Sequence, residues 1–262
     1  MREKQKRRPP SFLTEVDIAD FPGESEVIFE VVTKSSSSGA AIGQIADVFE
    51  AAARAGMFSK EPAAKTIPIE VVSVERFGGV GVRYIWKVTG IQVGAYRMLL
   101  NMLDVTHHFE QPLASSRLLS PIGGGKRMHW NDLIDAPFPI KSRKPPFALR
   151  VKQNLEDSRE PLIRLEFQRE IHDEELEILV PLILAWDTLV IRGGYLQDLD
   201  DRDPDLDIDA SLSSQQTYLA AANTVEHLFY EFIGPEAAYD TLVNMAVKLH
   251  RTFCPLAALE IG

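Results

Sequence analysis

Hydrophobic and polar positions divide the first half of the chain into six short segments. Alternation of apolar and polar residues with many β-branched side chains predicts strands, and apolar residues spaced three or four apart predict helices. Gly56 ends the first helical segment, because glycine readily adopts the left-handed conformation that closes a helix. The predicted strands are residues 26–34, 67–74, 82–88 and 113–119, and the predicted helices are residues 40–55 and 93–109. These elements follow the order βαββαβ.

The second half repeats this order with one ambiguous segment. Three acidic residues, Asp173, Glu174 and Glu175, mark the start of a helix, since negative charge favours a helix N-terminus. Residues 215–232 fit either a single helix or a loop that leads into a strand at residues 225–232. The remaining predicted elements are strands at residues 163–167, 206–212 and 256–261, and helices at residues 173–193 and 235–252.

An internal repeat supports this reading. Residues 95–114 align without a gap with residues 238–257 at an offset of 143 positions. Nine of the twenty positions are identical, whereas average residue usage predicts about one or two. The identical pairs are Ala95/Ala238, Tyr96/Tyr239, Leu99/Leu242, Asn101/Asn244, Met102/Met245, His107/His250, Pro112/Pro255, Leu113/Leu256 and Ala114/Ala257.

Pattern and repeat together predict an α+β fold built as a tandem duplication of a ferredoxin-like βαββαβ unit. The predicted organisation is a basic arm and lead-in at residues 1–24, a first unit at 25–119, a Gly- and Pro-rich linker at 120–146 and a second unit at 147–262. A sheet with helices on one side leaves its other face bare. We therefore expect the two sheets to pack face to face or to close a barrel-like seam, or the chain to form a homodimer.

Composition excludes several classes of protein. The net charge is -10, yet Arg2, Lys4, Lys6, Arg7 and Arg8 against Glu3 give the N-terminal arm a net charge of about +4. An acidic body opposes nucleic-acid binding except through this basic arm. No apolar run is long enough to span a membrane, and Cys254 is the single cysteine, so no internal disulfide can form. These features are typical of a soluble, cytoplasmic protein without a membrane partner.

The paired histidines are the sharpest chemical feature of the sequence. Helical spacing places Tyr96 and His107 on one face of the first repeated helix, and Tyr239 and His250 on the same face of the second. A histidine near a helix C-terminus can hydrogen-bond the last free carbonyls, which is a structural role. The alternative role is in a ligand site, for which the candidates are His107, His250, Tyr96, Tyr239, Asn101 and Asn244.

No motif in the sequence identifies a catalytic residue, a metal site or a cofactor. One histidine in each copy is too few to hold a metal ion. We expect a non-catalytic binding or regulatory module that uses the cleft between its two units, or their sheet surfaces, for an unknown protein or small ligand. The alternative is a ferredoxin-like α+β-barrel enzyme with a histidine-dependent pocket that binds a cofactor such as haem.

Overall fold

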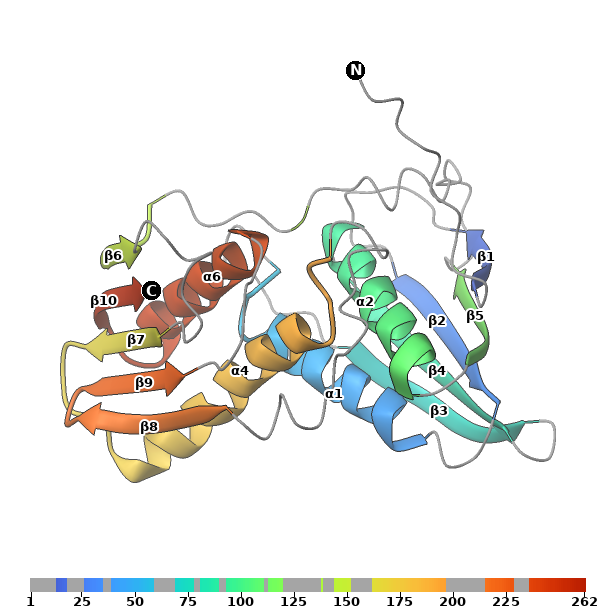
Figure 1. The fold of residues 1–262 in the computed structure, drawn as a ribbon, viewed down its shortest axis with the longest axis horizontal. Helices are drawn as coiled ribbons and strands as arrows, with labels where there is room; N and C mark the ends of the chain where they lie inside the picture. Colours follow the sequence, from blue (N-terminus) through green and yellow to red (C-terminus); the bar gives the residue numbers. More distant parts are fainter. Residues whose placement is uncertain are drawn as a thin grey trace, which may run out of the picture. The chain divides into compact units, whose positions relative to one another are not determined.

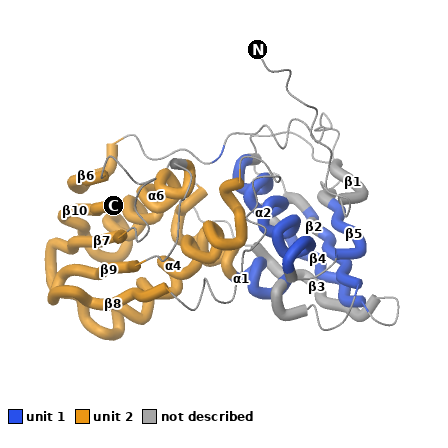
Figure 2. Tube along the Cα trace, viewed as in Figure 1, with its two compact units in different colours: residues 1–47, 67–138 blue, residues 48–66, 139–262 orange. Residues whose placement is uncertain are grey.

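The protein has a mixed α+β fold with two sheets and four α-helices in its described residues (Figure 1). The computed structural model describes residues 13–17, 26–34, 39–58, 69–77, 81–89, 93–110, 113–119, 138, 144–151, 162–196, 215–228 and 236–262. The chain divides into two compact units, of which the first comprises residues 1–47 and 67–138 and the second comprises residues 48–66 and 139–262 (Figure 2). The basic arm, most of the predicted linker and the predicted strand at 206–212 lie outside the described residues.

The first unit contains a five-stranded sheet. Its elements are β1 (Leu13–Asp17), β2 (Glu26–Thr33), the first part of α1 (Gly39–Arg54), β3 (Ile69–Phe77), β4 (Gly81–Thr89), α2 (Val93–Val105), the π-helical turn η2 (Thr106–Glu110) and β5 (Leu113–Leu119). Residues 48–54 of α1 belong to the second unit. The strand order is β1-β5-β2-β4-β3. Gly56 has a φ of 77° after the end of α1, which is the conformation that the sequence predicts for it.

The second unit contains the other five-stranded sheet, in the order β6-β10-β7-β9-β8. Its elements are β6 (Ala148–Val151), β7 (Leu162–Phe167), α4 (Asp173–Ile191), β8 (Gln216–Ala221), β9 (Thr224–Leu228), α6 (Glu236–Thr252) and β10 (Leu256–Ile261). When strands are counted within their own unit, both sheets have the same order. In both, the first strand pairs in parallel with the last strand at one edge of the sheet.

Two expectations from the sequence are corrected. The barrel-like closure is wrong for the described residues, because each sheet is open, with β1 and β3 or β6 and β8 at its edges. Face-to-face packing of the sheets stays a prediction. The single helix at 215–232 is also wrong: β8 and β9 form a hairpin whose turn is Ala222 and Asn223. The Asn223 amide donates a 2.9 Å hydrogen bond to the carbonyl of Phe167, which anchors this turn to β7.

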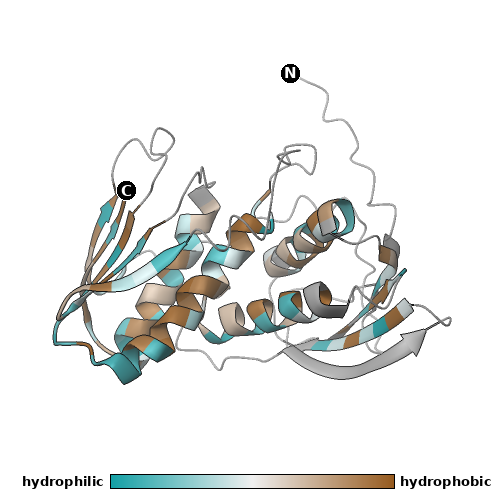
Figure 3. Cartoon of the chain, turned by 60° about the horizontal axis from the view of Figure 1, so that its bottom comes forward, coloured by the Kyte–Doolittle hydropathy of each residue, from teal (hydrophilic) through white to brown (hydrophobic). Residues whose placement is uncertain are grey.

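The core of each unit lies between its sheet and its helices. In the second sheet Ile163, Leu165 and Phe167 of β7 face α4 and α6 and are buried, and the residues between them lie on the other face. Bands of hydrophilic and hydrophobic colour alternate along these strands (Figure 3). The repeated helices are more deeply buried than a one-sided pattern predicts, since residues 94–106 and 241–247 are all buried. None of the described helices is long and apolar enough to cross a membrane.

Candidate functional site

The paired histidines make the same hydrogen bond in both units. His107 lies in the turn that ends α2, and its Nδ1 accepts a 2.8 Å hydrogen bond from the backbone N–H of Leu113, the first residue of β5. His250 lies in the last turn of α6, and its Nδ1 accepts a 3.0 Å hydrogen bond from the N–H of Leu256, the first residue of β10. Each histidine therefore ties the end of a helix to the start of the last strand, a contact that the sequence did not indicate.

The four other predicted site residues belong to the core of their units. Tyr96 and Asn101 on α2 are 0% and 4% exposed, and Tyr239 and Asn244 on α6 are 7% and 0% exposed. The Asn244 amide donates a 3.2 Å hydrogen bond to the carbonyl of Met57. Burial raises the pKa of Tyr96 and raises that of Tyr239 to about 12. A ligand-binding role for these residues and the two histidines stays a prediction.

A buried polar set that the sequence analysis missed lies in the second unit. His227 of β9 and Asp187 of α4 have side chains that are 1% and 0% exposed, with 3.9 Å between Nε2 of the histidine and Oδ2 of the aspartate. On the other side of the ring, Nδ1 of His227 lies 2.7 Å from the hydroxyl of Thr217 on β8. Neither carboxylate oxygen of Asp187 has a hydrogen-bond partner in the described residues.

Burial keeps both groups of this set uncharged. Removal from water disfavours a carboxylate and raises the pKa of Asp187 to about 8, and it disfavours an imidazolium and lowers the pKa of His227 to about 4. Near neutral pH the aspartate is therefore mostly a carboxylic acid beside a neutral ring. A carboxylic acid can donate a hydrogen bond, which a carboxylate cannot do.

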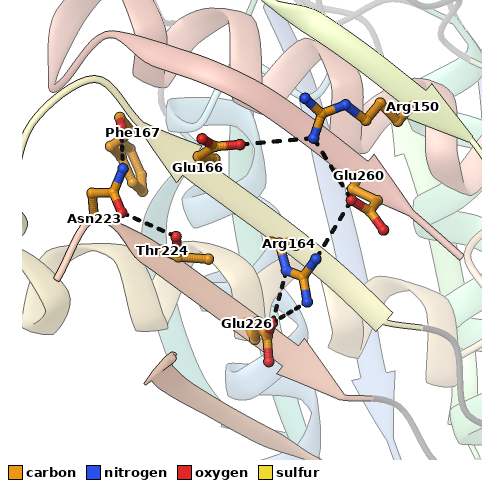
Figure 4. A network of polar contacts seen from close by, with 8 residues as sticks. All are labelled: Arg150, Arg164, Glu166, Phe167, Asn223, Thr224, Glu226 and Glu260. Atoms are coloured by element: carbon orange, nitrogen blue, oxygen red, sulfur yellow. Dashed lines mark hydrogen bonds and ion pairs between the residues drawn. The ribbon is translucent and has the colours of Figure 1, made fainter. Parts of the chain in front are cut away.

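The face of the second sheet that points away from α4 and α6, and that carries no helix among the described residues, has a row of alternating charges (Figure 4). Arg150 on β6, Glu260 on β10, Arg164 on β7 and Glu226 on β9 are cross-strand neighbours in that order. Arg164 donates a 2.7 Å hydrogen bond from Nε to Glu226 and lies 3.6 Å from Glu260, which in turn lies 3.9 Å from Arg150. Glu166 of β7 joins the row at 3.8 Å from Arg150.

Tyr218 extends this row onto β8, the edge strand. Its hydroxyl donates a 2.7 Å hydrogen bond to Glu226, and the ring is 38% exposed. The Tyr218 hydroxyl and the Arg164 guanidinium hold the pKa of Glu226 below its usual range, against the opposing effect of burial. We call Arg150, Arg164, Glu166, Tyr218, Glu226 and Glu260 the second sheet face.

The first sheet has a corresponding row in which the signs of the charges are exchanged. Glu30 on the central strand β2 accepts a 2.7 Å hydrogen bond from Nε of Arg83 on β4, and it lies 3.7 Å from Arg117 on β5. Arg117 is also in register with Glu15 of β1. We call the side chains of Glu30, Arg83 and Arg117 the first sheet face. Across β5, β2 and β4 it reads basic, acidic, basic, whereas β10, β7 and β9 read acidic, basic, acidic.

The described residues contain no group of three or more His, Cys, Asp and Glu side chains arranged to hold a metal ion. Cys254 is buried, and its pKa is raised by that burial, so its thiol is a poor nucleophile. The arrangement is better suited to recognition, because fixed charges on an open sheet can match a partner's surface.

No family model matches the chain, and no curated protein matches it in sequence.

Proposed function

We propose that this chain is a non-catalytic binding or regulatory module that recognises a protein partner through the helix-free faces of its sheets. The observation that carries this proposal is the second sheet face. Its charged side chains are held in place by ion pairs and by the hydroxyl of Tyr218, although they lie on the side of the sheet that faces away from α4 and α6.

A protein suits this surface better than a small molecule. Small ligands bind in concave, mostly apolar pockets, whereas the second sheet face is an open sheet surface with alternating charge. Complementary charges on a partner would set the register of a complex and suppress wrong partners, while an exposed aromatic ring such as that of Tyr218 supplies contact area.

We also propose that the two units descend from one ferredoxin-like βαββαβ unit. Three independent observations support this. The strand orders are the same, the histidine-to-strand hydrogen bond recurs at His107 and His250, and nine of twenty residues are identical at an offset of 143. Under this proposal β1 and β6 are an added parallel strand that each copy keeps at the same edge.

A photo-crosslinking amino acid at position 218, introduced in the cells that produce the protein, tests the binding proposal. Tyr218 is partly exposed on the second sheet face, and Glu177 is exposed on α4 and serves as the matched control. We expect a discrete crosslinked product from position 218 and none from position 177. No product from either position, or equal products from both, would contradict the proposal.

The histidine-dependent enzyme predicts a different result. Purified protein with bound haem would show an intense visible absorption band that is lost on replacing His107 or His250. Colourless protein that still crosslinks through position 218 is the result expected of a binding module.

A further inference from the structure

We propose that the protein partner is a second copy of this chain, whose first sheet face packs on the second sheet face. This inference rests on the proposed function and names the partner. The observation behind it is that the two faces carry the same row of charges with opposite signs.

At each equivalent position of the two rows, the charge in the first unit has the opposite sign to the charge in the second unit. The first row runs Arg117, Glu30, Arg83 across β5, β2 and β4, and the second row runs Glu260, Arg164, Glu226 across β10, β7 and β9. Arg117 and Glu260 are both the fifth residue of the last strand of their unit, β5 and β10, and are separated by 143 positions, the offset of the internal repeat. They are also both next to the central charge of their row, at 3.7 Å and 3.6 Å.

Stacking the two faces brings each charge of one row onto its opposite in the other. Consider a rotation of one sheet by 180° about an axis that crosses its strands, parallel to the row of charges. The charged face of that sheet then points toward the other sheet, and its strands keep the same order along the row. The first strand of one sheet then lies over the first strand of the other, so that Arg117 meets Glu260 and Glu30 meets Arg164. The same half-turn applied to two identical faces would place like charges together, which opposes binding.

The proposed contact joins two different surfaces, so it is heterologous. After the first contact forms, one copy retains its unused second face and the other retains its unused first face, so repeated contacts build rings or open chains and not closed dimers. Charge pairs at a partly hydrated interface are screened by salt within about 8 Å at physiological ionic strength. We therefore expect a weak, concentration-dependent assembly that dissociates at high salt.

Sedimentation velocity of the full chain over a range of concentrations tests this assembly. Arg117→Glu should disable the first face and Glu260→Arg the second, because each substitution places like charges together across the contact. These side chains are 49% and 23% exposed, so the fold should tolerate the substitutions, and thermal melting verifies that it does. Arg251→Glu on α6 and Glu177→Arg on α4 are the matched controls at exposed helix positions.

We expect the wild-type chain and both control variants to form species larger than dimers at low salt. Each face variant alone should raise the apparent dissociation constant by about tenfold or more, the equivalent of roughly 1.4 kcal/mol. In a mixture of the two face variants, the two unaltered faces complement each other and so do the two substituted faces, so the mixture should assemble beyond a dimer although each variant alone is impaired. The chain that carries both substitutions should assemble again, because its charges are exchanged and still complementary.

Two results would overturn the inference. The first is a wild-type chain that stays monomeric at low salt at every concentration. The second is assembly that both face variants leave unchanged. If position 218 nevertheless crosslinks to a different protein, the proposed function stands and only the identity of the partner is wrong. If position 218 crosslinks to nothing, the proposed function fails as well.

Discussion

The two units agree in their buried junctions and differ on their sheet faces. In both, a histidine at the end of a helix accepts a hydrogen bond from the first residue of the last strand, at Leu113 and at Leu256. On the sheet faces, by contrast, a central glutamate between arginines in the first unit is replaced by a central arginine between glutamates in the second.

The difference separates positions that hold the fold from positions that are free to specialise. A buried donor without an acceptor is costly, so the histidine junction tolerates little change. In the ion pairs of the sheet faces the Glu30 and Glu226 carboxylates are 12% and 11% exposed and their arginine partners are about a third exposed, so the fold needs opposite charges there but not one fixed orientation of the pair. A face whose charges have opposite signs in the two units across three strands is therefore a better candidate for recognition than the junction that is the same in both units.

Replacing the paired tyrosines has the largest expected effect and tests whether both are core residues. Tyr96→Ala and Tyr239→Ala should each lower the free energy of unfolding by about 3 to 5 kcal/mol through the cavity that the ring leaves. Tyr239→Phe should cost nothing measurable, because its hydroxyl has no hydrogen-bond partner in the described residues. Chemical denaturation measures all three. Negligible losses for the alanine variants would show that the rings are not buried.

The buried acid of the second unit predicts a pH dependence of about 2 kcal/mol. Asp187 has a folded-state pKa of about 8, above that of an unfolded aspartate, so its contribution to stability falls as the pH rises toward 8. His227 has a folded-state pKa of about 4, below that of an unfolded histidine, so its contribution rises with pH and is complete above about 6.5. The two trends offset each other below about pH 6.5, and only the effect of Asp187 remains above it.

Denaturation at pH 6.5 and pH 8 measures this dependence. The wild-type chain should lose about 2 kcal/mol over this interval, at about 1.4 kcal/mol for each pKa unit. Asp187→Asn should remove that loss, while Asp173→Asn at the exposed start of α4 should retain it. Equal slopes in the wild-type chain and Asp187→Asn would show that Asp187 is not a buried neutral acid.

The histidine junctions should respond equally in the two units. His107→Ala and His250→Ala each leave a backbone N–H without its acceptor and should cost about 1 to 2 kcal/mol. Asparagine places an oxygen close to the position of Nδ1, so His→Asn should recover part of the loss at both sites, whereas His→Gln should not. A cost at only one of the two histidines would break the equivalence of the units.

The sheet faces should show the smallest effects on stability. Double-mutant cycles for Arg83 with Glu30 and for Arg164 with Glu226 should give coupling free energies of about 0.2 to 1 kcal/mol, which decrease at high salt. We expect the same sign of coupling in both units although the charges are exchanged. A coupling of several kcal/mol in either unit would assign its face to holding the fold and not to recognition.

The sequence could predict the elements whose pattern is long or repeated. The mixed α+β fold is confirmed, and the predicted strand at 256–261 coincides with β10. The short strands β1 and β6 were missed, because five and four residues carry little periodic signal and depend on β5 and β10 for their hydrogen bonds. The hairpin of β8 and β9 was ambiguous, because its apolar spacing also fits a helix.

The candidate site was harder to predict than the fold. The rows on the sheet faces depend on strand order, which brings Arg150, Glu260, Arg164 and Glu226 together from four strands. The one available signal for the buried set was Asp187, a lone acid in the apolar stretch 185–190. Its neighbour His227 lay in the ambiguous segment, so no pattern assigned it to the core face of a strand.

The tautomers of His107 and His250 test most directly whether the two units share the same helix-to-strand junction. An Nδ1 that accepts a backbone N–H requires the proton of the neutral ring on Nε2, whereas the opposite tautomer of His250 would donate from Nδ1 to the carbonyl of Leu256 at 3.2 Å. A long-range ¹⁵N–¹H NMR spectrum of the folded protein, assigned with the two His→Asn variants, distinguishes the two tautomers. We expect the Nε2–H tautomer for both rings. An Nδ1–H tautomer at either histidine would show that its Nδ1 does not accept the backbone N–H and that the two junctions differ from this description.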